Sequence, residues 1–500
     1  MKNTNKIRLI VLLSGFISME LEILGTRLIS PIFGSTIYVW TSLIGVTLTF
    51  LALGYWYGGK LADKGKINLN KLGLIIFLLG VYVCLLPFIS RAVLYQVNSL
   101  GMILGPLSIS FVILAFPIFF LGFIVPTSVK LVTSSLGEVG RKAGEIYALA
   151  TVGSIIGTFT TGFFLILYLG VIKTALITGI ILILFSLIII KSKIKFLLIF
   201  AIPLLLIFQS QFVYPSEILE SFEGHNGQVR VIKENNVHMR LYNGALASTS
   251  VNLKTKENEM GYAKYFEIPF IYKPEHKKTL MVGLAGGAAA RELVEKYNLE
   301  MDVVEIEPKM LDLARKYFYW DDEATVYFDD GRHFIQNSDE KYDVIMIDIG
   351  LIFPAWHLYT KEAFQKYEKH LNDDGMLVIN LISAKEGKYS KTSKSLYKTL
   401  ELVFKDVLIL RHPRINPNGI QNIILLASKN NIYKNKFVST IKLSNYSGPS
   451  IEEIIEDNSN FEIEDNVRLT TDNFPIAEFY DYENRMNFEL TKKRLKYFLP

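Results

Sequence analysis

The chain has 500 residues and a formal net charge of +5, from 53 Lys and Arg against 48 Asp and Glu. The excess is uneven, because residues 1–212 hold 16 Lys and Arg and only 5 Asp and Glu, while the remainder is acidic. The basic average therefore does not indicate a nucleic-acid partner. The single cysteine, Cys84, excludes a disulfide framework and a thiolate metal site.

Residues 1–213 are predicted to form a multi-span membrane domain, because apolar segments of spanning length recur along them. We expect about seven helices: Ile7–Ile29, Thr36–Tyr57, Leu72–Ile89, Ile103–Val125, Tyr147–Leu169, Val171–Ile190 and Ile194–Val213. The first segment is not a cleavable signal peptide, since it contains Glu20, Glu22 and Arg27 and has no small-residue cleavage site.

Basic residues lie before the first segment and after the second, fourth and sixth, which predicts a cytoplasmic N-terminus and a multi-pass protein of the cell membrane. Seven crossings would put the rest of the chain outside, away from intracellular nucleotides. The last segment, which contains Pro203, is therefore expected to be re-entrant or interfacial. The side of the membrane for the soluble part stays open.

Charges within the first segment indicate either a structural pair or a polar cavity. Glu20 and Arg27 are seven residues apart and share a helix face, so they are expected to pair and hold the bundle together or to line such a cavity. Gly153, Gly157 and Gly162 are close to small-xxx-small spacing, which predicts tight helix packing.

Residues 214–275 are expected to form a small antiparallel β unit, because alternating runs from Gly227 to Leu253 are separated by turn residues. Strands and helices then alternate through residues 276–430, which predicts a parallel sheet with helices on both faces. The predicted strands are 278–284, 301–307, 325–330, 342–348, 375–382, 406–411 and 421–428. The last two have no helix between them and predict an edge hairpin; residues 431–500 are a C-terminal extension.

Ligands of such folds bind beyond the carboxyl ends of the strands. Gly283, Gly286 and Gly287 follow the first strand and allow a ligand to approach the backbone closely. Glu305 follows the second, about 20 residues on, where an acid binds ribose hydroxyls. Asp329, Asp330 and Gly331 follow the third, where a carboxylate can accept from an adenine amino group. Together they favour an adenosine-type ligand, and the G-x-x-G-G spacing makes NAD less favoured.

At these residues the sequence resembles the spermidine synthases, most closely their membrane-fused relatives with a multi-span N-terminus. The motifs are "VGLAGGAAARE", "VVEIEP", "DDGRHFI" and "EKYDVIMIDI". "FISMELEILGTRLISPIFGS", "PAWHLYTKEAF" and "LTTDNFPIAEF" resemble segments of the fused form. The resemblance covers nearly the whole chain. It implies an α-helical membrane domain followed by an α/β domain, a Rossmann-like, methyltransferase-type doubly wound sheet preceded by the small antiparallel unit.

The family transfers an aminopropyl group from decarboxylated S-adenosylmethionine to a polyamine. By resemblance, Glu305 holds the ribose, Asp330 and Gly331 meet the adenine, and Asp348 is the catalytic proton acceptor. A carboxylate suits this role, because a protonated amine must lose a proton before it can attack. Tyr262 and His357 are expected to contact the acceptor, although His357 also suits a role in orienting its loop.

The sequence departs from the family pattern where the amine or the aminopropyl arm would bind. The family's Gln after the Asp-Gly turn is Ala247 here, and the Asp of its glycine loop is Gly286. Its Tyr-His-Glu becomes Tyr262 followed by Ala263 and Lys264, and its second acid after the catalytic Asp becomes Leu351. A polyamine carries several positive charges, so these losses bear directly on the acceptor.

Three hypotheses follow. The first is an aminopropyltransferase. The second is a methyltransferase that uses intact S-adenosylmethionine on an apolar or membrane-delivered acceptor, with Leu351, Ile352, Phe353, Pro354 and Trp356 lining its pocket. The third is a non-catalytic, transport-like protein with a nucleoside-sensing domain, because "GGKLADK" resembles a major-facilitator loop.

The expected partners are the lipid bilayer, a small-molecule amine or other acceptor, and a second copy of the chain in a homodimer; nucleic acid is not expected. The expected co-substrate is S-adenosylmethionine or its decarboxylated form. No metal is expected, because no His, Cys and Asp cluster has ligand spacing.

Overall fold

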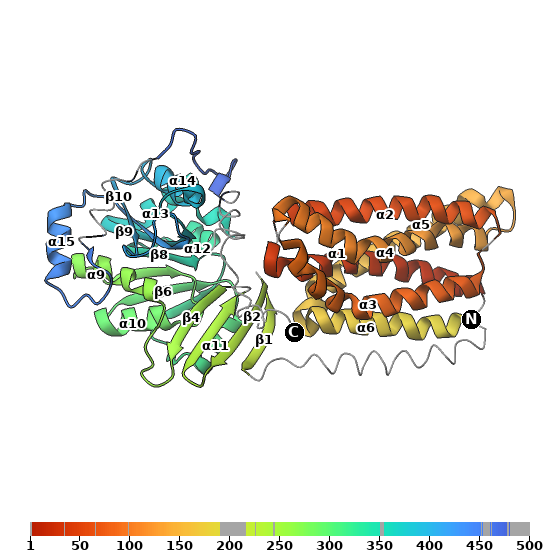
Figure 1. Cartoon of the computed structure of the whole chain (residues 1–500), viewed down its shortest axis with the longest axis horizontal. Helices are drawn as coiled ribbons and strands as arrows, with labels where there is room; N and C mark the ends of the chain where they lie inside the picture. The colour runs from red at the N-terminus through yellow and green to blue at the C-terminus, as the bar shows by residue number, and fades with distance from the viewer. Residues whose placement is uncertain are drawn as a thin grey trace. The chain divides into compact units, whose positions relative to one another are not determined.

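A computed structural model describes residues 3–34, 36–65, 67–98, 100–190, 217–225, 227–243, 246–350, 355–451, 453, 461, 463–477 and 480. The chain separates into two compact units. One contains the N-terminal helices, and the other, from Val229 onward, contains most of both sheets (Figure 1). Each unit is described by itself.

Within its described residues up to Ile190, the helical unit has six long helices. They are α1 (Asn3–Phe33), α2 (Ile37–Asp63), α3 (Leu69–Asn98), α4 (Gly101–Val132), α5 (Val139–Thr160) and α6 (Ile166–Ile189). A 3-10 helix, η1 (Leu136–Glu138), precedes α5, and a π-helical stretch, η2 (Thr161–Leu165), joins α5 to α6. Six of the seven predicted segments fall on them, and the seventh, Ile194–Val213, lies outside the described residues. The predicted boundary between the fifth and sixth segments is Gly170, where the backbone leaves the helix at φ 76° and ψ 171°.

Four stretches of these described helices are long and apolar enough to cross a membrane. They are Ile37–Asp63, Leu69–Leu94, Ile103–Val132 and Leu136–Ile189. Large apolar side chains are also exposed along the outside of the unit, among them Leu48, Trp56, Ile103, Phe159 and Phe163. In water this much exposed apolar surface would be costly, whereas hydrocarbon accommodates it.

The predicted glycine packing is present at two of its three positions. A Cβ atom on Gly153 would overlap the carbonyl oxygen of Leu12, and one on Gly157 would overlap that of Phe16. Helix α5 therefore lies directly against α1, as small residues permit. A Cβ on Gly162 would meet nothing within 4 Å, so this glycine serves no such contact.

The partner of Glu20 differs from the predicted one. Its side chain is completely buried, and the Thr178 hydroxyl on α6 donates to Glu20 Oε1 at 2.6 Å. Glu20 Oε2 has no hydrogen-bond partner among the described residues, so the expected pairing with Arg27 is wrong. The hydroxyl wins because Thr178 faces α1 directly, whereas Arg27 lies about two turns further along the same helix.

The small antiparallel sheet has four strands in the order β1-β2-β3-β4. They are β1 (Ile218–Gly224), β2 (Gly227–Glu234), β3 (His238–Asn243) and β4 (Leu246–Asn252). The prediction missed β1, whose residues are mostly half-buried and do not alternate clearly between apolar and polar. This sheet carries Thr249, which reaches the glycine loop of the larger sheet.

The larger sheet has seven strands in the order β10-β11-β9-β8-β5-β6-β7. They are β5 (Lys278–Val282), β6 (Glu300–Glu305), β7 (Thr325–Phe328), β8 (Tyr342–Gly350), β9 (Leu371–Ser383), β10 (Asp406–Arg411) and β11 (Gln421–Ser428). The first five are parallel, and β11 runs antiparallel between β9 and β10, which confirms the predicted edge hairpin. The chain proceeds outward from β5 to β7 and returns at β8, so the switch point lies between β5 and β8.

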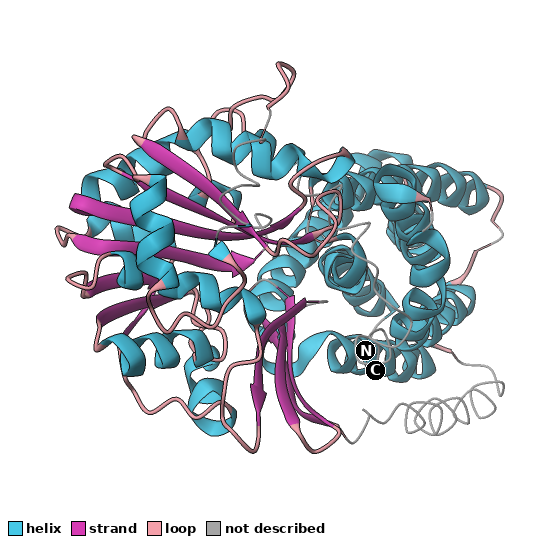
Figure 2. Ribbon diagram, turned by 60° about the vertical axis from the view of Figure 1, so that its left-hand side comes forward, coloured by secondary structure: helices cyan, strands magenta, loops and turns pink. Residues whose placement is uncertain are grey.

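Helices cover both faces of this sheet, which confirms the doubly wound α/β fold (Figure 2). One face packs on α10 (Ala288–Tyr297), α11 (Lys309–Tyr317), α15 (Lys434–Lys442) and the segment η3–α9 (Gly261–Tyr272). The other packs on α12 (Gly331–Asn337), α13 (Lys361–His370) and α14 (Lys391–Leu400), near the turns η4 (Trp356–Leu358) and η5 (Lys388–Ser390).

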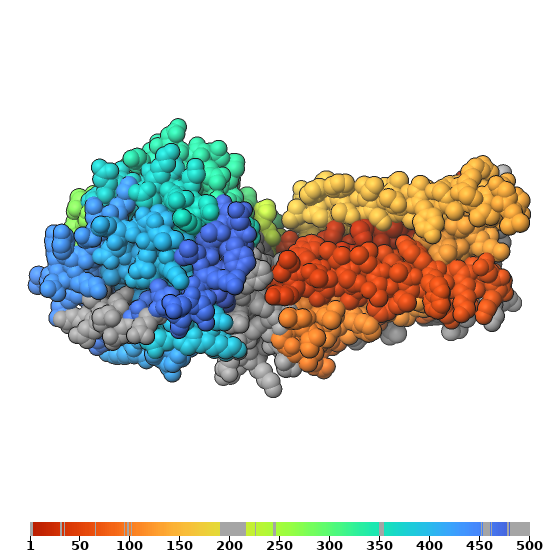
Figure 3. Space-filling model, turned by 90° about the horizontal axis from the view of Figure 1, so that it is seen from above, coloured from red at the N-terminus to blue at the C-terminus, as the bar shows by residue number. Residues whose placement is uncertain are grey.

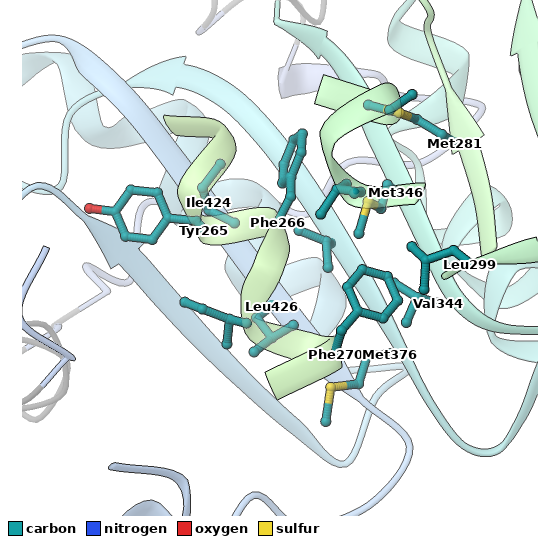
Figure 4. Packing of buried hydrophobic residues seen from close by; sticks show 14 of the residues in the cluster. Tyr265, Phe266, Phe270, Met281, Leu299, Val344, Met346, Met376, Ile424 and Leu426 are labelled. Carbon is teal, nitrogen blue, oxygen red and sulfur yellow. The ribbon is translucent and has the colours of Figure 1, made fainter. Parts of the chain in front are cut away.

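Alternating strand residues set these two cores. Met281, Val344 and Met346 point toward the η3–α9 segment, where Phe266 and Phe270 fit among them (Figure 4). The intervening strand residues point to the opposite core. The packing of Phe266 and Phe270 fixes η3 over the sheet and, with it, Tyr262 one turn earlier.

Candidate active site

The candidate base, Asp348, ends the apolar part of β8 at the carboxyl edge of the sheet. Its two oxygens have separate partners: the Tyr262 hydroxyl donates to Oδ2 at 3.1 Å, and the Asn380 amide donates to Oδ1 at 2.7 Å. The register pairs Ile347 with Ile379, so Asp348 and Asn380 are the next residues on adjacent strands. The Tyr262 ring packs edge-on against Phe266, which holds it in place.

Burial dominates the ionisation of Asp348. It raises the pKa of this carboxyl from its ordinary value to about 6, although the hydrogen bonds from Asn380 and Tyr262 favour the carboxylate. The same burial and the neighbouring carboxylate raise the pKa of Tyr262 far above its usual range, so the phenol stays a donor. At neutral pH Asp348 is therefore ionised and more basic than an exposed aspartate.

Asn380 and Asn422 are members of the site that the sequence analysis missed. The Asn422 side-chain amide donates to Asn380 Oδ1 at 3.0 Å, which turns the NH₂ group of Asn380 toward Asp348. Asn380 is 1% exposed, so it has no access to alternative partners in water. Polar residues inside otherwise apolar strands, "VINLI" and "QNIILL", are the signal from which they could have been found.

The glycine loop lies beside Asp348. Gly283 has φ +102°, and a Cβ atom there would stand 2.5 Å from the Asp348 carbonyl oxygen, so this approach of β5 to β8 requires glycine. Gly287 has φ +73° and starts α10. The Gly286 amide donates to Thr249 Oγ1 at 2.9 Å. A helix start next to a tight loop is a suitable place for a ligand's polar groups.

Glu305 organises this loop. Its Oε2 accepts from the Leu284 and Ala285 amides at 2.9 and 3.3 Å, and its Oε1 accepts from the Glu307 amide at 3.0 Å. Burial raises the pKa of Glu305, while the backbone donors act in the opposite direction. Glu305, which is predicted to bind the ribose, thus also fixes the loop through hydrogen bonds. Its Oε1 can still accept a further hydrogen bond from a hydroxyl.

Asp330 and His357 form a pair at the start of α12. His357 Nε2 lies 2.8 Å from Asp330 Oδ2, while Asp330 Oδ1 caps the helix by accepting from the Arg332 and His333 amides. Burial opposes ionisation of Asp330, but His357 and the two amides outweigh it and hold the pKa below its ordinary value. A Cβ atom on Gly331 would overlap Val282, so this residue keeps α12 close to β5.

The residues that depart from the family pattern have surroundings that suit the smaller or different side chain. A Cβ on Gly286 would stand 2.8 Å from Thr249 Cγ2 and 2.9 Å from Phe318, so an aspartate does not fit there. Ala263 is buried. Lys264 forms an ion pair with Glu267 at 3.2 Å, so its charge is compensated within η3. Ala247 is half-buried on β4.

The predicted apolar pocket falls largely outside the described chain. Leu351, Ile352, Phe353 and Pro354, four of the residues predicted to line an apolar pocket, lie outside the described residues. Trp356 lies in η4 and packs partly buried against the core. Within the described ranges, no group of three or more His, Cys, Asp or Glu side chains could hold a metal ion.

The strand order and the polar groups at the carboxyl edge place this part of the chain in the class of doubly wound α/β domains. Residues 263–433 match the family model of the spermine/spermidine synthase domain. The C-terminal part of the chain therefore carries a spermine/spermidine synthase domain.

Curated relatives carry the name polyamine aminopropyltransferase. The protein from Clostridium botulinum (strain Eklund 17B / Type B) is 29% identical over 146 residues, which cover 28% of this chain and 51% of that protein. The protein from Alkaliphilus oremlandii is 30% identical over 145 residues, which cover 27% and 51%. The chain thus spans about half the length of the curated relatives it matches.

Among solved structures, the chain is similar to a probable spermidine synthase from Corynebacterium glutamicum, with 17% identity and a TM-score of 0.42 over 51% of this chain and 96% of that one. Spermidine synthase from Thermotoga maritima gives 19% identity and a TM-score of 0.35 over 53% and 84%. Both TM-scores lie below 0.5, so the fold described above rests on the strand order of this chain itself.

Proposed function

We propose that the protein is a membrane-anchored transferase of the spermidine synthase type, which moves an aminopropyl group from decarboxylated S-adenosylmethionine to an amine. The observation that carries the proposal is the carboxylate of Asp348, held by Tyr262 and Asn380 beside the glycine loop, with a pKa of about 6. The family domain and the names of the relatives support the reaction class.

In the proposed reaction, the acceptor amine attacks the aminopropyl carbon bonded to the sulfonium. The new carbon–nitrogen bond forms as the carbon–sulfur bond breaks, and methylthioadenosine leaves. An alkyl ammonium has a pKa of about 10.4, so the amine must lose a proton to react. Asp348 accepts that proton, while the donors Tyr262 and Asn380 hold its two oxygens in position.

The nucleoside would lie along the carboxyl edge on the other side of the switch point. Glycine at 283 and 287 lets it approach the backbone, Glu305 would accept from ribose hydroxyls, and Asp330 and Gly331 would meet the adenine. Support comes from the common position of these groups at the ends of β5, β6 and β7. No metal takes part in this proposal.

We also propose that α2 to α6 lie within the cell membrane as a multi-pass domain. Support comes from the four apolar stretches and from the large apolar side chains on the outside of the helical unit. The bilayer would then anchor the transferase and could deliver an amphipathic acceptor.

Methyl transfer from intact S-adenosylmethionine is the second candidate. The crowded Gly286 and the buried Ala263 favour it, because both positions lack the polar groups with which the family binds the aminopropyl arm or the amine. With fewer carboxylates, a polycationic acceptor gains less from the site.

One experiment separates the candidates. The full chain, purified in detergent, is titrated calorimetrically with decarboxylated S-adenosylmethionine, S-adenosylmethionine and methylthioadenosine, and is then incubated with each donor and a panel of amines. Tighter binding of the decarboxylated donor with release of methylthioadenosine supports the proposal. Release of S-adenosylhomocysteine from the intact donor would show methyl transfer in place of the proposed reaction. Binding without turnover would indicate nucleoside sensing. Absence of binding would contradict aminopropyl transfer, methyl transfer and nucleoside sensing alike.

A further inference from the structure

A C-terminal segment, residues 467–477, docks on the larger sheet's helices. It lies at the surface of its unit (dark blue in Figure 3). The Ser395 hydroxyl donates to the Arg468 carbonyl at 2.7 Å, the Lys398 ammonium donates to the Val467 carbonyl at 2.8 Å, and the Thr470 amide donates to Thr399 Oγ1 at 3.1 Å. The partners of the segment, Ser395, Lys398 and Thr399, all belong to α14, so the segment runs along that helix.

A turn within the segment presents Asp472. Thr471 and Phe474 exchange backbone hydrogen bonds of 3.1 Å across this turn. The Asp472 carboxylate accepts two hydrogen bonds from Arg332, at 2.6 and 2.5 Å, and a third from the Thr360 hydroxyl at 2.6 Å. The Asp472 amide in turn donates to Glu362 Oε2 at 2.9 Å.

Arg332 is the link between this turn and the nucleoside end of the site. It follows Gly331 directly, and its guanidinium donates to the His357 carbonyl at 2.8 Å as well as to Asp472. Its side chain is 15% exposed, so its charge depends on a fixed partner. A guanidinium that pairs with a carboxylate through two parallel bonds has one orientation. In this orientation Arg332 also donates to the backbone of η4.

We propose that Asp472 is a positioning residue: through Arg332 it fixes the Asp330–His357 pair, so the C-terminal segment completes the nucleoside end of the site. The inference rests on the proposed function in assuming that Asp330 faces the adenosine. Without Asp472, Arg332 loses its bidentate partner and η4 loses the bond that holds the His357 backbone to the start of α12.

The test compares two variants of the full chain in detergent. Asp472→Asn removes the charge that pairs with Arg332. Glu464→Gln is the matched control, because Glu464 binds Lys394 of α14 at 2.7 Å and so attaches the same part of the chain elsewhere. We expect Asp472→Asn to weaken methylthioadenosine binding about tenfold in calorimetry, and Glu464→Gln to change it less than about twofold. Equal losses in both variants would overturn the proposal.

A double-mutant cycle tests the route through Arg332. If Asp472 acts through Arg332, Arg332→Gln and Arg332→Gln/Asp472→Asn bind methylthioadenosine equally weakly. Additive losses would overturn the proposal. Should Asp472→Asn lower the melting temperature by more than a few degrees, Arg332→Lys replaces it in the comparison, since this variant keeps the charge and loses the paired geometry.

A second readout does not require a nucleoside. Hydrogen exchange of the Leu358 and Tyr359 amides, which bond to Ala355 and Trp356, reports the order of η4. Faster exchange in Asp472→Asn but not in Glu464→Gln supports the positioning role, and unchanged exchange in both contradicts it. If the wild-type chain binds no methylthioadenosine, the proposed function fails, and this exchange still decides the role of Asp472.

Discussion

Asn380 donates a hydrogen bond of 2.7 Å to Oδ1 of Asp348, and the two residues directly follow the paired Ile347 and Ile379 on adjacent parallel strands. Behind them Asn422 fixes the orientation of the Asn380 amide. The series of hydrogen bonds from Asn422 through Asn380 to Asp348 joins β11, β9 and β8. The edge hairpin of the sheet therefore contributes directly to the candidate site.

Replacing Asn380 with leucine should move the acid limb of the reaction to higher pH. The bond from Asn380 favours the carboxylate, so its removal raises the pKa of Asp348 above the present value of about 6. The measurement is kcat/KM against pH for wild-type and Asn380→Leu proteins, with Asn372→Leu as a control at the amino end of β9. A limb that stays at the same pH in Asn380→Leu would contradict the assigned contact.

The Asp348→Asn variant should become more stable relative to wild type as the pH rises. The pKa of Asp348 is about 6 in the folded chain, against about 3.9 when unfolded. A raised carboxyl pKa adds stability below about pH 4, and that stability is lost as the pH rises through 6. The melting temperature of Asp348→Asn relative to wild type should therefore increase between pH 4 and 7. A difference in melting temperature that stays constant with pH would show that burial does not raise the pKa of Asp348.

The overall fold could be predicted because periodicity and turn chemistry are local signals. Alternation of strands and helices gave the doubly wound sheet, and the absence of a helix between 411 and 421 gave the edge hairpin. Gly170 marked the break between two apolar helices. Strand β1 was missed because its residues are half-buried and carry no clear alternation.

The site was predictable where a residue's position at a strand end is enough, as for Asp348 and Glu305. Partners that are distant in sequence were not: Asn380 lies 32 residues from Asp348, and Asp472 lies 140 residues from Arg332. The partner of Glu20 was predicted wrongly for the same reason, since helix spacing shows which residues share a face but not which neighbouring helix faces them.

An aspartate at position 286 should destabilise the protein rather than restore an amine-binding acid. Its Cβ would be forced against Thr249 and Phe318, and overpacking of this kind costs about 1–3 kcal/mol. The measurement is the melting temperature of Gly286→Asp. Gly261→Asp is the control, because a Cβ there meets nothing within 4 Å. Equal melting temperatures for the two variants would show that the loop has room for an acid.

The contact between α1 and α5 should tolerate no methyl group at Gly153. Alanine there must separate the helices, because its Cβ would overlap the Leu12 carbonyl, at a cost of about 1–3 kcal/mol. Gly162→Ala, in open space, should be neutral or slightly stabilising. Thermal unfolding of the detergent-solubilised chain compares them, and an unchanged Gly153→Ala variant would argue against the close approach.

The most direct test of the central claim is aminopropyl transfer by the full chain, with methylthioadenosine release measured for wild-type and Asp348→Asn proteins. Loss of a general base lowers turnover by about 10²–10⁴-fold. We predict a loss in this range, with affinity for methylthioadenosine within about twofold of wild type, because Asp348 lies outside the predicted nucleoside contacts. Turnover by Asp348→Asn at the wild-type rate would contradict the role of Asp348 as the proton acceptor.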